Sequence, residues 1–178
     1  ADAITLLTSG DLPLEIELPR PDMVGVDRLL DALAANHLRP RGRPAVVVDV
    51  GTAITVDLVS PQGVFRGGAI LPGLAMSARA LYELTDLLPR IEAEDLSEPP
   101  PPLGTATKPA MRSGLFWGAV GAIRELIGQL ADPLEPAVFL SGGAGPAVAR
   151  LLGPAARHVP HLTLAGIALA AGALQKGS

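Results

Sequence analysis

The stretch that most constrains this chain runs from Ala45 to Gly73 and reads AVVVDVGTAITVDLVSPQGVFRGGAILPG. It contains three runs of β-branched and other apolar residues, which is the composition of buried strands. A short break at Gly51-Thr52 separates the first two runs. The second break, Ser60-Pro61-Gln62-Gly63, has the residues of a tight turn, because proline presets φ and glycine allows positive φ. Since Pro72-Gly73 ends the extended structure, we predict strand, tight bend, strand, turn and strand.

Acidic, hydroxyl and glycine residues crowd this hairpin. An unpaired buried carboxylate is costly, so we expect Asp49 at a strand end, facing a cation or hydrogen-bond donors. Gly51 lets backbone N–H groups approach phosphate oxygens, Thr52 and Thr55 add hydroxyls, and Asp57 is a second carboxylate. The glycines at 67, 68 and 73 have no side chain, so a ligand or another backbone segment can approach the chain closely there. A tight hairpin that needs glycine and Asp only for its turn is the alternative. Because these residue types gather on one hairpin, we favour a phosphate or cation site.

Composition narrows the class of protein. A chain of 178 residues with 48% hydrophobic and 18% charged residues is one domain, or part of a two-lobed protein, with ample core. A net charge of −4 without a basic block argues against a nucleic-acid partner. The absence of cysteine excludes disulfides and agrees with a cytoplasmic location. The apolar stretch 162–174 is too short for a bilayer, so we predict a buried helix and no membrane partner.

Helices and strands are expected to alternate along the rest of the chain. Apolar residues at 26, 29, 30 and 33 have helical spacing, with Asp27 in the first turn. A long helix is expected at about 110–130, with Pro109 at its first position and Thr107 as a possible cap. Further helices are expected at about 74–84, 146–152 and 162–174, and further strands at 137–140 and 157–159. This order predicts an α/β fold with a mixed β-sheet and flanking helices.

Five separated motifs together resemble the type III pantothenate kinases. They are Gly25-Val26-Asp27-Arg28, which matches the GxDR motif of that family, then VDVGTAITVDLV, GGAILPG, the loop LGTAT before a long helix, and FLSGG. Their order and spacing agree with the family over nearly all of the chain. The resemblance implies the actin-like ATPase superfamily, whose members have two RNase H-like lobes with nucleotide between them. It divides this chain into residues 1–44, a remnant of the first lobe with the GxDR helix, and residues 45–178, the second lobe.

The same resemblance implies a reaction, cofactors and partners. The family makes 4′-phosphopantothenate from pantothenate and ATP in coenzyme A biosynthesis. Its members are homodimers that use Mg²⁺ and a monovalent cation, K⁺ or NH₄⁺. Phosphoryl transfer depends mainly on positioning and charge neutralisation, with a carboxylate to take the hydroxyl proton.

Residue by residue, the resemblance assigns roles to the matching positions. Asp27 is implied as the general base on the pantothenate hydroxyl, and Gly25, Val26 and Arg28 as the lining of the pantothenate site. Asp49 is implied as the ligand of the monovalent cation, and Thr52 as a contact of the ATP phosphates. Thr107 is implied as a pantothenate contact near the dimer interface. On residue type alone, the pattern favours an ordinary surface acid at a helix start for Asp27.

Two departures from the family pattern leave alternatives open. Ala106 stands where the family loop G-x-N-T has asparagine, which removes a hydrogen-bonding amide. The family's first-lobe phosphate motif, D-x-G-N-T, does not occur before Gly25. Either the chain is a fragment of a full kinase, or a separate polypeptide supplies the first lobe, or this is a truncated homologue without ATP turnover. The last case predicts a dimeric binding or accessory protein. A kinase of the same superfamily that acts on a sugar or small acid is a third, weaker alternative.

Overall fold

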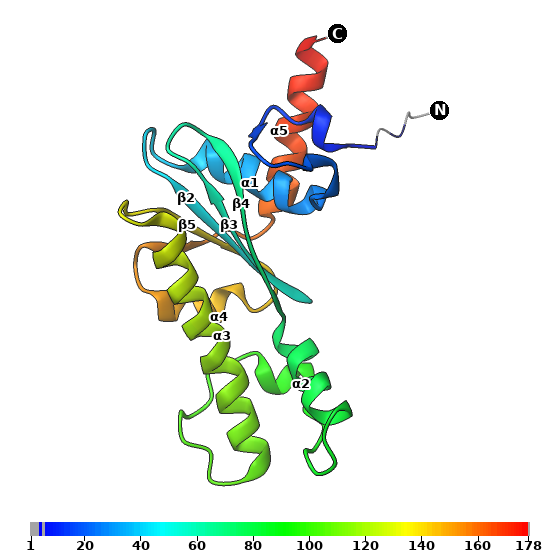
Figure 1. Cartoon of the computed structure of the whole chain (residues 1–178), viewed down its shortest axis with the longest axis vertical. Coiled ribbons are helices and arrows are strands. Elements are labelled where there is room, and N and C mark those ends of the chain that lie inside the picture. Colours follow the sequence, from blue (N-terminus) through cyan, green and yellow to red (C-terminus); the bar gives the residue numbers. More distant parts are fainter. Residues whose placement is uncertain (1–3, 5, 178) are drawn as a thin grey trace.

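The computed structural model describes residue 4 and residues 6–177 of the chain. Figure 1 shows an elongated molecule with a single twisted sheet near the two chain ends. Helix α2 (Leu74–Glu83) and the first part of helix α3 (Thr107–Ala131) extend away from the sheet, at the opposite end of the molecule. The described part of the chain contains no helix with the length and apolar character needed to cross a membrane.

The sheet has six strands in the order β1-β4-β3-β2-β5-β6. Strands β2, β3 and β4 form an antiparallel meander, whereas β5 and β6 run parallel to β2, and β1 runs parallel to β4 at the other edge. This arrangement confirms the predicted mixed sheet with flanking helices. The bounds are β1 Glu15–Ile16, β2 Ala45–Val50, β3 Ala53–Val59, β4 Val64–Pro72, β5 Ala137–Ser141 and β6 Ala156–His158.

Two apolar cores lie on opposite faces of the sheet, because successive strand residues point to opposite sides. Val46 and Val48 belong to the core under α3 and helix α4 (Gly145–Leu152), whereas Val47 belongs to the core under helices α1 (Val26–Leu38) and α5 (Leu162–Gly177). We call these the α3 face and the α1 face. With helices on both faces, β2 is apolar at nearly every position. Strand β1 is paired with β4 within this sheet, and α1 packs on β2 and β3. The division of the chain at residues 44/45 stays a prediction.

The start of α3 differs from the prediction. The helix begins at Thr107 with Ala106 at the N-cap position, so Thr107 does not cap it and Pro109 is its third residue. Proline is tolerated there, because the first N–H groups of a helix have no partner within the helix. The preceding loop lies against this first turn, since a Cβ at Gly104 would be 2.2 Å from the backbone nitrogen of Ala110.

The prediction of a buried helix at 162–174 was wrong in part. One face of α5 packs on α1, with Leu162 and Ala170 fully buried. A Cβ at Gly166 would lie 2.2 Å from the carbonyl oxygen of Leu30, so the two helices cross in backbone contact. The other face is exposed, and Leu164 keeps 60% of its surface accessible. Hydropathy alone does not distinguish the two faces, because both are apolar.

Candidate active site

The bend between β2 and β3 is closed by its own chain. The Gly51 N–H donates to the Ala53 carbonyl at 3.1 Å, and the Gly73 N–H donates to the Thr52 carbonyl at 3.0 Å. A Cβ at Gly73 would be 2.3 Å from the Thr52 oxygen, and one at Gly68 would be 1.9 Å from the Val56 oxygen. The predicted close approach at these two glycines is therefore an approach of the protein's own backbone. Thr52 itself is exposed at the tip of the bend.

Asp49 lies between two glycine turns at the end of β2. It pairs across the sheet with Thr55 on one side and with Ser141 on the other. Its oxygens are so close to Gly51 and Gly142 that a Cβ would come within 3.3 Å and 2.6 Å of them, respectively. Burial raises the pKa of this carboxyl, and the charge of Asp27 adds to the rise. Within the described residues its oxygens accept no hydrogen bond.

Asp27 occupies the first turn of α1, as predicted, and its side chain is exposed. One carboxylate oxygen accepts a hydrogen bond of 2.9 Å from the backbone N–H of Arg28. A Cβ at Gly25 would lie 2.5 Å from the same oxygen, so this side-chain position requires glycine there. The charge of Asp27 also contributes to the raised pKa of Asp49 of β2. Val26 lies between Gly25 and Asp27 and is partly buried.

Arg28 turns the other way, toward the sheet. Its Nε donates to Asp57 of β3 at 3.0 Å, and its Nη2 donates to the second oxygen of the same carboxylate. The guanidinium carbon lies 5.9 Å from the centre of the Phe65 ring. Burial raises the pKa of Asp57, and the hydrogen bonds from Arg28 oppose that rise. The sequence analysis missed this pair, although an acid inside an apolar strand indicates a buried cationic partner.

A further buried acid, also missed, lies one helical turn beyond Asp27. Asp31 is 5% exposed and accepts a hydrogen bond of 2.7 Å from the hydroxyl of Thr163 in α5. Burial raises its pKa to about 6, and the charges of Asp49, Asp27 and Asp57 add to the rise. Four carboxylates from α1, β2 and β3 therefore share the α1 face.

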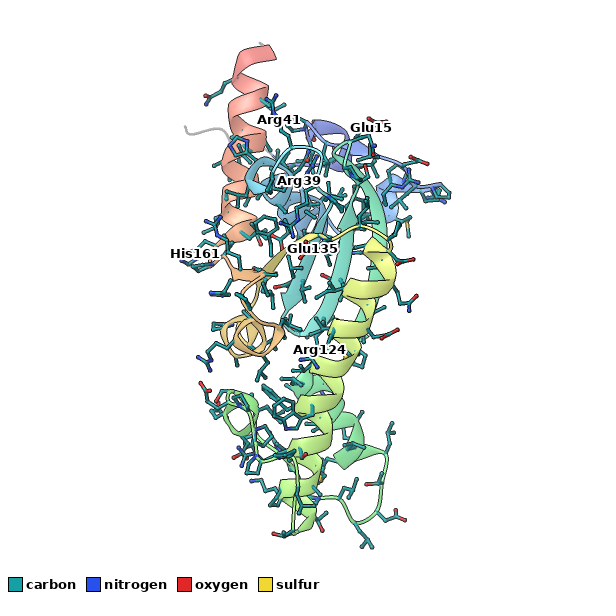
Figure 2. All side chains as sticks on the ribbon, turned by 90° about the vertical axis from the view of Figure 1, so that its left-hand side faces the viewer. Glu15, Arg39, Arg41, Arg124, Glu135 and His161 are labelled. Atoms are coloured by element: carbon teal, nitrogen blue, oxygen red, sulfur yellow. The ribbon has the colours of Figure 1, made fainter. Side chains whose placement is uncertain are left out.

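His161, just before α5, lies on the other side of the sheet from α3 (Figure 2).

Thr107 is not brought to this site. It is the first residue of α3, and that end of α3 lies at the far end of the molecule from α1 and α5 (Figure 1). Its side chain is exposed, and the neighbouring Lys108 forms an ion pair of 2.9 Å with Asp95. Within one chain, Thr107 and Asp27 cannot contact the same small substrate.

The carboxylates of this site fit a cation that takes its remaining ligands from a bound molecule or from water. Among the described residues, no group of three or more His, Asp or Glu side chains is placed to hold a metal ion. Mg²⁺ commonly takes one or two carboxylates and fills its remaining positions with phosphate oxygens and water. Asp49 is a single half-buried carboxylate, so a cation at this position would take its remaining ligands from a bound molecule or water. A pocket of about 180 Å³ opens beside the bend, lined in part by Val50, Gly51, Leu74 and Gly143.

The chain matches proteins of one family. A family model described as type III pantothenate kinase matches residues 3–129. Relatives described as type III pantothenate kinase occur in Acidiphilium cryptum, with 40% identity over 90% of this chain, and in Gluconobacter oxydans, with 37% identity over 96%. The chain spans 59% and 63% of the length of these two relatives.

A solved structure agrees with the fold. It is described as a candidate Baf family transcriptional activator from Campylobacter jejuni, and it is 22% identical to this chain. The TM-score is 0.67, and the match covers 94% of this chain and 72% of the other. At this identity the likeness concerns the fold alone, whereas the matched family model covers most of the sequence. The chain therefore belongs to the type III pantothenate kinase family.

Proposed function

We propose that this chain acts in the phosphorylation of pantothenate. The reaction transfers the γ-phosphoryl group of ATP to the pantothenate hydroxyl and gives 4′-phosphopantothenate, in coenzyme A biosynthesis. The observation that carries the proposal is the exposed carboxylate of Asp27, held at the start of α1 by the Gly25 gap and the Arg28 N–H, beside the half-buried Asp49.

In this proposal Asp27 is the catalytic base. The pantothenate oxygen forms a bond to the γ-phosphorus, the bond from that phosphorus to the β–γ bridging oxygen breaks, and ADP leaves with those electrons. The hydroxyl proton passes to Asp27, which is exposed and therefore open to substrate. Gly25, Val26 and the backbone of Arg28 line the acceptor site around it.

The hairpin serves the nucleotide side of the site. Asp49 holds a monovalent cation, K⁺ or NH₄⁺, because its oxygens accept no hydrogen bond from the described residues. Thr52, exposed at the bend, contacts the ATP phosphates. Mg²⁺, when bound with ATP, neutralises phosphate charge.

In this proposal the chain forms a homodimer in the cytoplasm. Thr107 lies far from Asp27 in one chain, so it contacts pantothenate only in the site of a second copy. Gly114, Gly118 and Gly121 support a helix interface, because a Cβ at any of them would meet no atom within 4 Å. Such a stripe lets another helix approach α3 closely.

The test is ATP-dependent phosphorylation of pantothenate by this chain, in K⁺ buffer with Mg²⁺. Asp27→Asn should abolish turnover and leave the unfolding temperature unchanged. The matched control is Asp22→Asn, which removes an exposed acid of the same segment that pairs with Arg20. A rate that survives in Asp27→Asn would remove Asp27 from the role of base.

A dimeric binding or accessory protein without catalysis is the second candidate. The chain spans about three-fifths of the length of these two relatives, so the activity of the whole protein is a proposal for this chain. Thermal shift separates the two candidates. A kinase gains stability with ATP and Mg²⁺, whereas a non-catalytic relative responds to pantothenate alone.

A further inference from the structure

Asp57 is an unusual residue for its place in the fold. It lies in β3, an inner strand, between Val47 of β2 and Gly68 of β4, and it is 2% exposed. A buried carboxylate in the middle of a sheet is costly unless it is paired and hydrogen-bonded. The only cation bonded to it among the described residues is Arg28.

The surroundings of Asp57 are arranged for this pairing. A Cβ at Gly68 would come within 2.7 Å of its Oδ1, so the glycine leaves room for the carboxylate. Thr55, two residues earlier on the same face of β3, lowers the pKa of Asp57. Phe65 of β4 lies under the guanidinium group of Arg28. Three residues of the sheet therefore favour the binding of the Arg28 guanidinium group at Asp57.

The pair uses only part of the guanidinium group. Nε and Nη2 are bonded to the two oxygens of Asp57, and Nη1 has no hydrogen bond within the described residues. This two-point contact fixes the orientation of the planar group as well as its position. Because Arg28 is in the first turn of α1, directly after Asp27, the contact ties this turn to β3.

We propose that Asp57 is a positioning residue of the phosphoryl-acceptor site, acting through Arg28 to hold the first turn of α1, and with it Asp27, against the sheet. This inference rests on the proposed function, since it assigns a role within the same site. Asp57 itself touches no substrate, because it lies beneath Arg28. Replacing Asp57 should therefore move groups of the site without removing a group that contacts the substrate.

The central test compares Asp57→Asn with the wild-type chain in the pantothenate kinase assay. The variant keeps the volume of the side chain and loses the charge. We expect kcat to fall by about tenfold to a hundredfold, the range for a slightly misplaced catalytic group. The KM for ATP should stay unchanged, because the proposed nucleotide contact Thr52 lies at the bend between β2 and β3 and not at Asp57.

Two further variants separate positioning from stability. Val59→Ala removes a fully buried side chain from the same strand and face, so it destabilises the sheet without touching Arg28. It should lower the unfolding temperature and leave kcat unchanged. The double variant Arg28→Met with Asp57→Asn leaves no unpaired buried charge, so it should regain stability. A merely structural role predicts that Asp57→Asn and Val59→Ala lower kcat alike for the same loss of unfolding temperature, whereas positioning predicts that only Asp57→Asn lowers it.

A magnetic resonance measurement decides the inference without any turnover. The Arg28 Nε–H signal reports its hydrogen bond to Asp57, and the amide signals of residues 25–29 report the first turn of α1. Both sets should shift in Asp57→Asn and not in Val59→Ala. Shifts in a chain that never phosphorylates pantothenate would leave the positioning role standing and reject the proposed reaction. Unshifted signals, or an unchanged kcat in Asp57→Asn, would overturn the inference.

Discussion

Thr163 on α5 donates a hydrogen bond of 2.7 Å to the buried carboxylate of Asp31 on α1, although 132 positions separate the two residues. Asp31 is one turn beyond Asp27 on the same helix. The last helix of the chain therefore supports the helix that carries the proposed base. This contact, and the helix crossing beside it, lead to the first two predictions.

The stability of the protein should depend on the ionisation of Asp31. Burial raises its pKa from 3.8 to about 6. Between these values the folded state binds more protons than the unfolded state, so this group stabilises the protein most below about pH 4. The contribution is lost as pH rises through about 6, and its size is on the order of 3 kcal/mol. Urea unfolding from pH 4 to 7 measures it.

Asp31→Asn is the control for this pH dependence, because its amide cannot ionise. Relative to the wild-type chain, the variant should gain free energy of unfolding as pH rises. The other carboxylates titrate in both proteins, so their effects largely cancel in the difference. A constant difference across the pH range would show that Asp31 titrates normally in the folded state.

The crossing of α1 and α5 should not tolerate a side chain at Gly166. In Gly166→Ala the new Cβ would lie 2.2 Å from the Leu30 carbonyl oxygen, which is backbone and cannot rotate away. We expect a loss of about 1–3 kcal/mol in the free energy of unfolding. Gly172→Ala is the matched control on the same helix, since no atom lies within 4 Å of its Cβ. It should be stabilising by about 0.5–1 kcal/mol, because alanine favours the helix.

Gly25→Ala should damage the reaction more than the fold. The new Cβ would be 2.5 Å from a carboxylate oxygen of Asp27, and this side chain can rotate away at little cost. The rotation displaces the proposed base, so we expect kcat to fall by about tenfold or more. The unfolding temperature should change little. Gly10→Ala serves as the control, because its nearest neighbour is 3.9 Å away. Equal rates in the two variants would contradict the position assigned to Asp27.

The monovalent cation should act through Asp49. Replacing K⁺ by Na⁺ should lower the rate of pantothenate phosphorylation, and K⁺ should raise the unfolding temperature of the wild-type chain more than Na⁺ does. Asp49→Asn should respond equally to both salts in both measurements. Asp95→Asn, which removes an acid that pairs with Lys108 away from the hairpin, should keep the K⁺ preference. A K⁺ response that survives in Asp49→Asn would place the cation elsewhere.

Local pattern in the sequence was enough for most of the secondary structure. The alternating apolar runs of 45–73 predicted three strands, and the structure has them at Ala45–Val50, Ala53–Val59 and Val64–Pro72. The helical spacing after Val26 predicted α1, with Asp27 in its first turn. These strands and this helix depend on residues that lie within a few positions of one another in the sequence. The spacing of apolar residues shows these local relationships directly.

What the sequence by itself determined is thus the elements, the family and the candidate residues of the site. The tertiary structure decided which of these residues meet. Asp57 pairs with Arg28, Asp31 meets Thr163, and Thr107 lies far from Asp27. It also decided that α5 buries only one of its two apolar faces. The reason is physical: such contacts join positions that are distant in the chain, and they depend on how helices are placed on the sheet, which no local spacing encodes.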